Sequence, residues 1–209
     1  MRFIFYSLAL SLFAAACSVG RKAPAARITS NELLERLYLK DLSIRALDAE
    51  TDTVNLEKHD QIHREQVFQL LAENKVITAK DKMRAAWILQ HTAAKFCDGE
   101  LTSTSAENFL LAYKLSSTAL AMLEKDRDTL TIQKENLARI VALNYDRYLL
   151  FTKGYQKFGT QFIFDDHTQE MLLAPIDTTL ASDAERAKHH VEPLKTLLAK
   201  NKYKPLRDE

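Results

Sequence analysis

The chain has 209 residues, a length that allows one large domain or two small ones at about 150 residues per domain. Hydrophobic residues make up 46% and charged residues 27%, which is usual for a folded protein and excludes extensive disorder. The net charge of +1 provides no overall field that would attract nucleic acid. Four Gly and four Pro are too few for a turn-rich β-sandwich or barrel, so the composition favours long helices.

The first residues have the order of a bacterial export signal. Arg2 precedes an uncharged, largely apolar run from Phe3 to Ala16, which is shorter than the ~20 residues that a membrane-spanning helix needs. The run ends at Ala14-Ala15-Ala16-Cys17, which resembles the lipobox of bacterial lipoproteins, in which the signal peptide is removed before a lipid-carrying cysteine. We therefore expect a signal peptide over 1–16 and a lipid anchor on Cys17. Ordinary cleavage after Ala16 and an uncleaved anchor are the alternatives.

This interpretation predicts an exported protein of the bacterial cell envelope, held by its lipid on the periplasmic or outer face of a membrane. Residues 17–27 include Gly20 and Pro24 and lack hydrophobic periodicity, as is typical of a flexible tether. Residues 28–205 are interpreted as a single α-helical domain. Capping boxes and helical periodicity predict five antiparallel helices at about 30–49, 52–72, 78–91, 104–124 and 128–152.

The composition of the chain changes after Gly154, the expected C-cap of the fifth helix. Aromatic and β-branched residues, a polar turn at Asp165-Asp166 and a second apolar run predict a β-hairpin at about 158–175. Ser182 then caps a final helix that Pro193 interrupts or restarts. The expected fold class is mainly α, an antiparallel helical bundle or short helical array with one C-terminal β-hairpin. Tetratricopeptide-type repeats are a minor alternative.

Motifs of known enzyme classes are not found in the sequence. His59 and His63 have the spacing of the zinc-peptidase H-E-x-x-H motif, but Asp60 replaces its glutamate, so a solvated charged face is the favoured interpretation. No G-x-S-x-G motif and no glycine-rich phosphate loop occurs. We therefore expect no metal and no cofactor.

Three segments place polar side chains in apolar surroundings: Gln90-His91, Asp146-Arg147 and Gly159-Thr160-Gln161. Buried polar groups need hydrogen-bond partners, so these residues are expected to find them in one another. Gln90, His91 and Gln161 should converge on one polar pocket, which either stabilises the domain or binds a ligand. The residues of this candidate polar pocket are Gln90, His91, Asp146, Arg147, Gln156, Gly159, Gln161, Asp183 and Arg186.

Two features of the candidate polar pocket are more specific. Phe158 and Phe162 are expected to form its roof. Arg147 is expected either to pair with Asp183 or to reach the loop at Gly159-Thr160-Gln161. The glycine would let the backbone approach closely where a side chain would block it.

The order of these motifs resembles that of a bacterial family of unknown function. Its elements are A-x-x-x-Q-H, A-x-x-L-x-x-x-A, D-R-x-L, Q-x-x-G-T-Q-F, and D-x-x-R followed by V-x-P-L. In this chain they correspond to Ala86 to His91, Ala112 to Ala119, Asp146 to Leu149, Gln156 to Phe162, Asp183 to Arg186 and Val191 to Leu194. The resemblance covers roughly residues 80 to 195, and it implies a fold and the position of a site, but no reaction.

Two hypotheses for the function follow. The first is a binding or interaction module for an unidentified small ligand or protein partner, because such a module needs no catalytic motif. The second is a hydrolase-type enzyme that uses a His/Asp/Arg/Gln pocket with His91 as general base.

Overall fold

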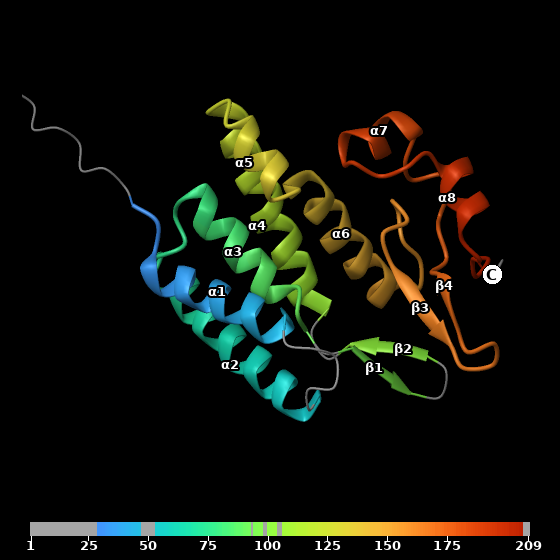
Figure 1. The fold of residues 1–209 in the computed structure, drawn as a ribbon, viewed down its shortest axis with the longest axis horizontal. Coiled ribbons are helices and arrows are strands. Elements are labelled where there is room, and N and C mark those ends of the chain that lie inside the picture. The colour runs from blue at the N-terminus through green and yellow to red at the C-terminus, as the bar shows by residue number, and fades with distance from the viewer. Residues whose placement is uncertain (1–28, 47–52, 93, 98–99, 104–105, 207–209) are drawn as a thin grey trace, which may run out of the picture.

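The fold, given by a computed structural model, is mainly helical (Figure 1), as predicted. The structure describes residues 29–46, 53–92, 94–97, 100–103 and 106–206; the expected signal peptide and tether lie outside these residues. Eight helices occur in the described part. They are α1 (Glu32–Ala46), α2 (Thr53–Ala72), α3 (Ala79–Leu89), α4 (Ala106–Lys125), α5 (Thr129–Lys134), α6 (Leu137–Lys153), α7 (Asp183–Lys188) and α8 (Leu194–Lys200).

Local capping determines several helix ends at the predicted places. Before α3, the Thr78 hydroxyl accepts from the Asp81 N–H at 3.1 Å, and the Asp81 carboxylate accepts from the Thr78 N–H at 3.0 Å. Ser182 caps α7 by accepting from the backbone N–H of Glu185. Gly154 ends α6 in the left-handed conformation, with a φ of 77°.

The predicted continuous helix over 128–152 is wrong, because the chain forms α5 and α6 there instead. Asp128 caps α5 with a 3.0 Å bond from the Thr131 N–H, and α5 ends after one and a half turns at Lys134. Asn136 then adopts a left-handed conformation with φ 48°, which asparagine tolerates better than most residues. The break turns α6 away from α5.

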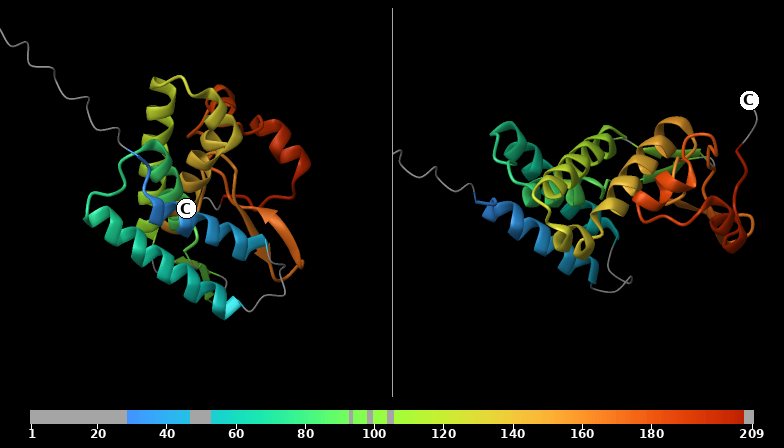
Figure 2. Two further views of the ribbon diagram at one scale, coloured as in Figure 1. Left: turned by 60° about the vertical axis from the view of Figure 1, so that its left-hand side comes forward. Right: turned by 90° about the horizontal axis from the view of Figure 1, so that it is seen from above.

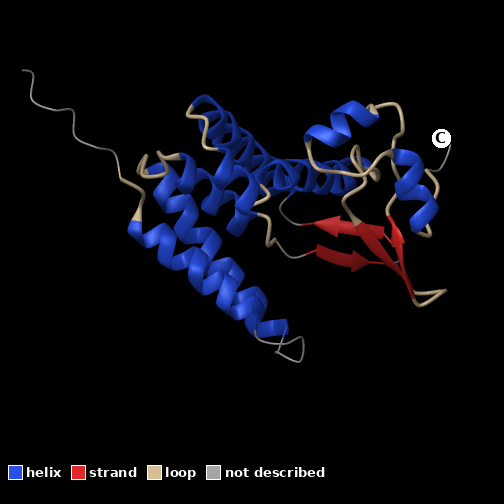
Figure 3. Cartoon of the chain, turned by 45° about the horizontal axis from the view of Figure 1, so that its top comes forward, coloured by secondary structure: helices blue, strands red, loops and turns tan. Residues whose placement is uncertain are grey.

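The predicted C-terminal hairpin is confirmed. It consists of β3 (Phe162–Asp165) and β4 (Glu170–Leu173), which pair antiparallel with Phe162 opposite Leu173. A second antiparallel ladder, β1 (Ala94–Cys97) with β2 (Glu100–Ser103), was not predicted. The first of its strands, Ala-Lys-Phe-Cys, contains no β-branched residue, so it lacks the aromatic and β-branched run that predicted the C-terminal hairpin. Figure 3 shows both ladders beside the helical part of the molecule.

Helix α4 is central to the helical part, because it packs against α3 and against α6. Helices α1 and α2 also contact α3, and the four helices share one apolar core that includes Leu34, Val67, Leu89 and Ala112. Figure 2 shows that α6 lies between these first helices and the C-terminal elements α7, α8 and β3–β4. Among the residues described, no helix has the length and hydrophobicity that crossing a membrane requires.

Two left-handed glycines provide a matched test of this packing. A Cβ on Gly159, where φ is 92°, would lie 2.3 Å from Cδ2 of Leu197, whereas a Cβ on Gly154 would meet no atom within 4 Å. We expect Gly154→Ala to lower the free energy of unfolding by about 1–2 kcal/mol through its backbone conformation alone. Gly159→Ala should cost about 1–3 kcal/mol more because of the overlap. Urea denaturation measures both, and equal losses would show that the close approach at Gly159 is not required.

Candidate functional site

A cluster of charged and polar side chains is buried where the last turns of α1 and α3 face α2. At its centre is Asp41 of α1, which is 2% exposed. The indole N–H of Trp87 donates to Asp41 Oδ2 at 3.0 Å, and the Nε–H of Arg45 donates to the same oxygen at 3.3 Å. The Nδ1 atom of His91 lies 3.1 Å from Oδ2. One carboxylate therefore connects α1 with the end of α3.

The position of the proton on His91 depends on two contacts of its Nδ1 atom. Nδ1 lies 3.1 Å from Oδ2 of Asp41, an acceptor, and 3.0 Å from Nε of Arg45, whose N–H is a donor within hydrogen-bond distance of both Nδ1 and Asp41. We infer that the proton is on Nδ1 and is donated to Asp41, because a lone pair there would face the negatively charged oxygen. The Nε–H of Arg45 is then donated to Asp41 instead of to the imidazole. This arrangement leaves the lone pair of the neutral ring on Nε2.

Burial and neighbouring charges shift the pKa values of this pair. Burial raises the pKa of Asp41, but the hydrogen bond and charge of His91, followed by Arg45 and Trp87, outweigh burial and hold it below its usual value. Burial lowers the pKa of His91, and the opposing effect of Asp41 does not compensate. At neutral pH the pair therefore consists of a carboxylate and an uncharged imidazole.

Helix α2 adds three buried polar residues to the cluster. Asp60 accepts a 2.6 Å charged hydrogen bond from Nη2 of Arg45, and burial raises the pKa of Asp60 in spite of it. His63 is 2% exposed, with its Nδ1 atom 3.9 Å from Asp41. Arg64 is also buried. The sequence-based interpretation of this segment as a solvated charged face is therefore wrong, because these three side chains are buried against α1 and the end of α3.

The carboxyl end of α3 is held by side chains from three directions. The hydroxyl of Thr92 donates to the carbonyl of Leu89 at 3.0 Å. Nη1 of Arg147, on α6, donates to the carbonyl of Gln90 at 2.7 Å, and Nη1 of Arg64, on α2, donates to the carbonyl of His91 at 2.5 Å. These donors satisfy three carbonyls that the helix leaves without partners, and they fix the backbone that carries His91.

A second buried network surrounds Asp146 of α6, which is 0% exposed. Its Oδ1 accepts from the backbone N–H groups of Lys157 and Phe158 at 2.8 and 2.7 Å. Its Oδ2 accepts from those of Gly159 and Thr160 at 2.9 Å each, and from the Thr160 hydroxyl at 2.8 Å. The loop after α6 is therefore folded around one carboxylate.

Two further side chains complete this loop. Gln156 donates from Nε2 to the carbonyls of Gln161 and Ala174, both at 2.9 Å, and accepts from the Gln161 N–H at 2.8 Å. Arg186 of α7, 0% exposed, donates to the carbonyls of Phe158 and, at 3.0 Å, Lys157. All of these bonds are internal to the loop and its supports, so this network has a structural role.

The structure brings part of the candidate polar pocket together. Arg147 reaches the loop, as one alternative predicted: its Nε donates to Oε1 of Gln161 at 3.2 Å, while Nη1 reaches Gln90. Asp183 is not the partner of Arg147; its carboxylate caps α8 by accepting from the backbone N–H of Leu194 at 2.8 Å and lies 3.9 Å from Arg186.

The expected aromatic roof is not formed as predicted. Phe158 packs in the core under α7 with Ala142 and Val191, and its ring centre lies 4.7 Å from that of His189. Phe162 is 41% exposed on β3. The predicted single pocket is thus two networks, one at His91 and one at Asp146, that Arg147 and Gln161 connect.

Sequence reasoning missed the residues of α1 and α2 that complete the site. Asp41 and Arg45 are one helical turn apart, and the spacing alone is common on solvated helices. Asp60 and His63 had drawn attention only as part of a metal-like motif. In the described residues, no group of three or more His, Cys, Asp or Glu side chains is arranged to hold a metal ion.

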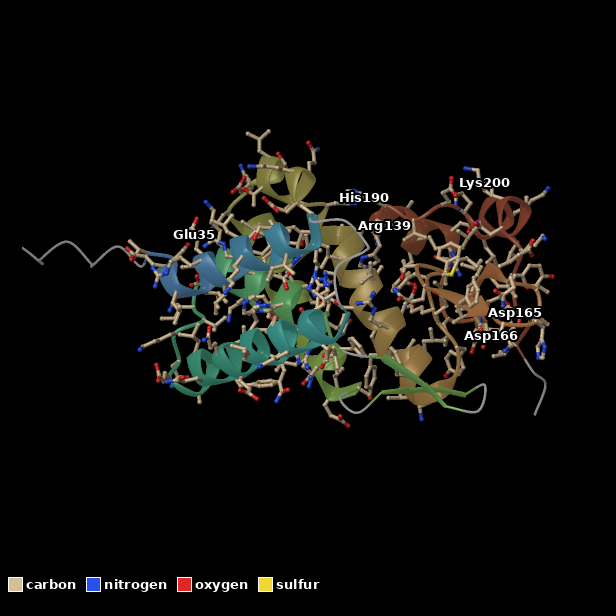
Figure 4. All side chains as sticks on the ribbon, turned by 60° about the horizontal axis from the view of Figure 1, so that its bottom comes forward. Glu35, Arg139, Asp165, Asp166, His190 and Lys200 are labelled. Atoms are coloured by element: carbon tan, nitrogen blue, oxygen red, sulfur yellow. The ribbon has the colours of Figure 1, made fainter. Side chains whose placement is uncertain are left out.

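An open cavity of about 400 Å³ lies beside the cluster. Its lining includes Trp87, which also donates to Asp41, together with Tyr38 and Leu143. Figure 4 shows Arg139, another lining residue, next to His190, to whose carbonyl it donates at 3.3 Å. The indole of Trp87 therefore belongs both to the buried cluster and to the wall of this cavity.

Comparison of the chain with protein-family models, with curated proteins and with solved structures found no match. The resemblance to a bacterial family of unknown function therefore stays a prediction.

Proposed function

We propose that this protein is a hydrolase-type enzyme in which His91 is the general base. The observation that carries the proposal is the pairing of His91 Nδ1 with the buried Asp41 carboxylate at 3.1 Å. A carboxylate on one ring nitrogen orients the imidazole and stabilises the positive charge that develops when the other nitrogen takes up a proton. Burial keeps the pKa of His91 below its usual value, so the ring is ready to accept a proton at neutral pH.

In the proposed step, Nε2 of His91 takes a proton from a water molecule. The water oxygen forms a bond to an electrophilic carbon or phosphorus of the substrate, and the bond to the leaving group breaks. The imidazolium then returns the proton to the leaving group. Asp41 stays ionised throughout and acts through His91, so it is a positioning residue.

The surroundings of His91 support this role because they restrict its movement. Its backbone carbonyl is held by Arg64, the preceding carbonyl by Arg147, and its ring packs edge-on against Trp87 with the ring centres 5.6 Å apart. A general base that is fixed before the substrate arrives needs no further ordering during the reaction.

A binding module for a small ligand is the second candidate. The side-chain oxygen Oε1 of Gln90 favours it, since this atom is buried without a hydrogen-bond partner in the described part of the chain. An unpaired buried acceptor costs about 1–3 kcal/mol, which a bound donor would recover. Saturable binding of a ligand without turnover would select this candidate.

The first test is the loss of turnover in His91→Gln. With p-nitrophenyl acetate, p-nitrophenyl phosphate and bis(p-nitrophenyl) phosphate as probes, we expect the wild-type protein to hydrolyse at least one, and His91→Gln to be about 10²–10⁴-fold slower. His167→Gln, in the exposed turn between β3 and β4, is the matched control and should remain active. Equal rates for the wild type and His91→Gln, or no hydrolysis by either, would contradict the enzyme proposal.

The pH dependence adds a second readout from the same assay. A protonated His91 cannot accept a proton, so kcat/KM should fall tenfold per pH unit below its pKa, which lies under the usual imidazole value of about 6.5. In Asp41→Asn the charge that raises this pKa is removed. The residual activity should therefore show its acid limb at lower pH than the wild type, and a limb that did not move would contradict the pairing.

We further propose that the protein is a lipoprotein of the bacterial cell envelope, anchored through Cys17 on the periplasmic or outer face of a membrane. The support is the order of Arg2, an apolar run and Ala14-Ala15-Ala16-Cys17. In a bacterial host, Cys17→Ser should lose the added lipid mass and leave the membrane fraction, since stable anchoring takes two or more acyl chains. A variant that remained membrane-bound, with only the substitution changing its mass, would contradict the anchor.

A further inference from the structure

The guanidinium group of Arg147 has an environment that its structural role does not fully explain. Arg147 is partly buried on α6. Every other buried arginine near the site faces a carboxylate, as Arg64 does Glu57, at 2.8 Å. Among the side chains of residues 29–46, 56–92 and 106–206, no carboxylate oxygen lies within 4.0 Å of Arg147. A partly buried positive charge without a counter-ion is costly, which makes the site a candidate for an anion.

The bonds that Arg147 forms use only part of its capacity. A guanidinium has five N–H donors. One from Nε goes to Gln161 Oε1 at 3.2 Å, and one from Nη1 goes to the carbonyl of Gln90 at 2.7 Å. The group also lies over the ring of Phe109, 5.7 Å from its centre, which attracts the charge but accepts no ordinary hydrogen bond. The other donors have no acceptor among residues 29–46, 56–92 and 106–206.

A second guanidinium, that of Arg45, lies at the same end of α3. Its Nε is 3.0 Å from Nδ1 of His91, while Arg147 contacts the carbonyl of the adjacent Gln90. Burial, and then the positive charge of Arg45, lower the pKa of Arg147 to about 10. Arg147 remains charged at neutral pH, and the two groups repel each other. Arg45 already pairs with Asp41 and Asp60, so an anion at this end of α3 would balance chiefly the charge of Arg147.

We propose that Arg147 binds an oxyanion group of the substrate, a phosphate or a carboxylate, at the end of α3 that carries His91. The planar fork of arginine suits both groups, which accept several charged hydrogen bonds at once. Gln161 orients the fork and the Asp146 loop positions Gln161, so the structural network serves the binding site. This inference rests on the proposed function for the reaction, but the anion site can be tested without turnover.

The purely structural alternative is that Arg147 serves as a cap for α3 and a link to Gln161. Two hydrogen bonds satisfy that role, and a neutral donor would avoid burying a charge near Arg45. The two interpretations differ in what an added anion does. If Arg147 only caps α3, phosphate should not bind to it. If Arg147 forms an oxyanion site, phosphate should bind there.

The test uses the full mature chain with inorganic phosphate and acetate as probes, at constant ionic strength set with chloride. We follow the Nε–Hε NMR signal of Arg147, assigned by its loss in Arg147→Lys, and the Tm. Phosphate or acetate should shift this signal in a saturable way and raise the Tm. Tighter binding of phosphate would identify a phosphate-bearing substrate, and tighter binding of acetate a carboxylate. No saturable shift with either anion would overturn the inference.

Variants separate this site from other cationic surfaces. Arg147→Gln should weaken anion binding about 10- to 100-fold, the loss expected for a charged hydrogen bond. Arg139→Gln, which removes a half-buried guanidinium on the same helix, should leave it unchanged (Figure 4). If Arg147→Gln unfolds, Arg147→Lys replaces it, since a point charge without the fork should bind more weakly. Unchanged affinity in the folded Arg147 variant would contradict the site.

His91→Gln distinguishes this inference from the proposed reaction. It should abolish turnover while phosphate or acetate still binds, because the anion contacts Arg147 rather than the base. Turnover in the wild type without any anion binding would leave the hydrolase proposal standing and exclude the oxyanion site. Anion binding without turnover would exclude the reaction and retain the site.

Discussion

The carboxylate of Asp41 is almost inaccessible to water, and the arrangement of the candidate site follows from how its charge is balanced. A buried carboxylate needs donors, and here they come from an indole, a guanidinium and an imidazole on α1 and α3. These contacts fix the relative position of the two helices and orient His91.

Asp146 is a second buried carboxylate that needs hydrogen-bond donors, and most of its donors come from the backbone of one loop. Four consecutive backbone N–H groups and a hydroxyl close around this carboxylate, so the loop at 157–160 has one conformation. Gln161 directly follows this loop, and its side-chain oxygen accepts a hydrogen bond from Arg147. Arg147 in turn donates to the carbonyl of Gln90, the residue before His91. Two buried carboxylates, one on α1 and one on α6, thus position two sides of one site.

The sequence predicted the parts of this fold that depend on local signals. Helix starts at Thr78 and Ser182, the stop at Gly154 and the C-terminal hairpin depend on neighbouring residues, and all occur as expected. Asp146, Arg147 and Gln161 were recognisable because polar residues in apolar surroundings must find partners. The break at Asn136 was not, since asparagine is compatible with both a helix and a left-handed turn.

Asp41, Arg45 and Asp60 could not be identified for a different reason. Each lies on a helix whose pattern of charges is compatible with a solvated face. Only the packing of α1 and α2 against α3 buries Asp41 and Asp60 and half-buries Arg45. The division into two networks likewise depends on tertiary contacts: His91 faces α1, whereas the motif around Gly159 faces α7 and α8. Sequence motifs reveal that such residues need partners, but the choice of partner is a property of the fold.

The proposed role of His91 as a general base depends most directly on which nitrogen of its imidazole carries the proton. A long-range ¹H–¹⁵N NMR correlation spectrum of the imidazoles at pH 7.5, with His91 assigned by His91→Gln, distinguishes the two neutral tautomers and the imidazolium from their nitrogen shifts. We predict a neutral His91 with its proton on Nδ1 and an unprotonated Nε2. A proton on Nε2, in the neutral ring or in the imidazolium, would show that Asp41 does not prepare His91 to act as a base.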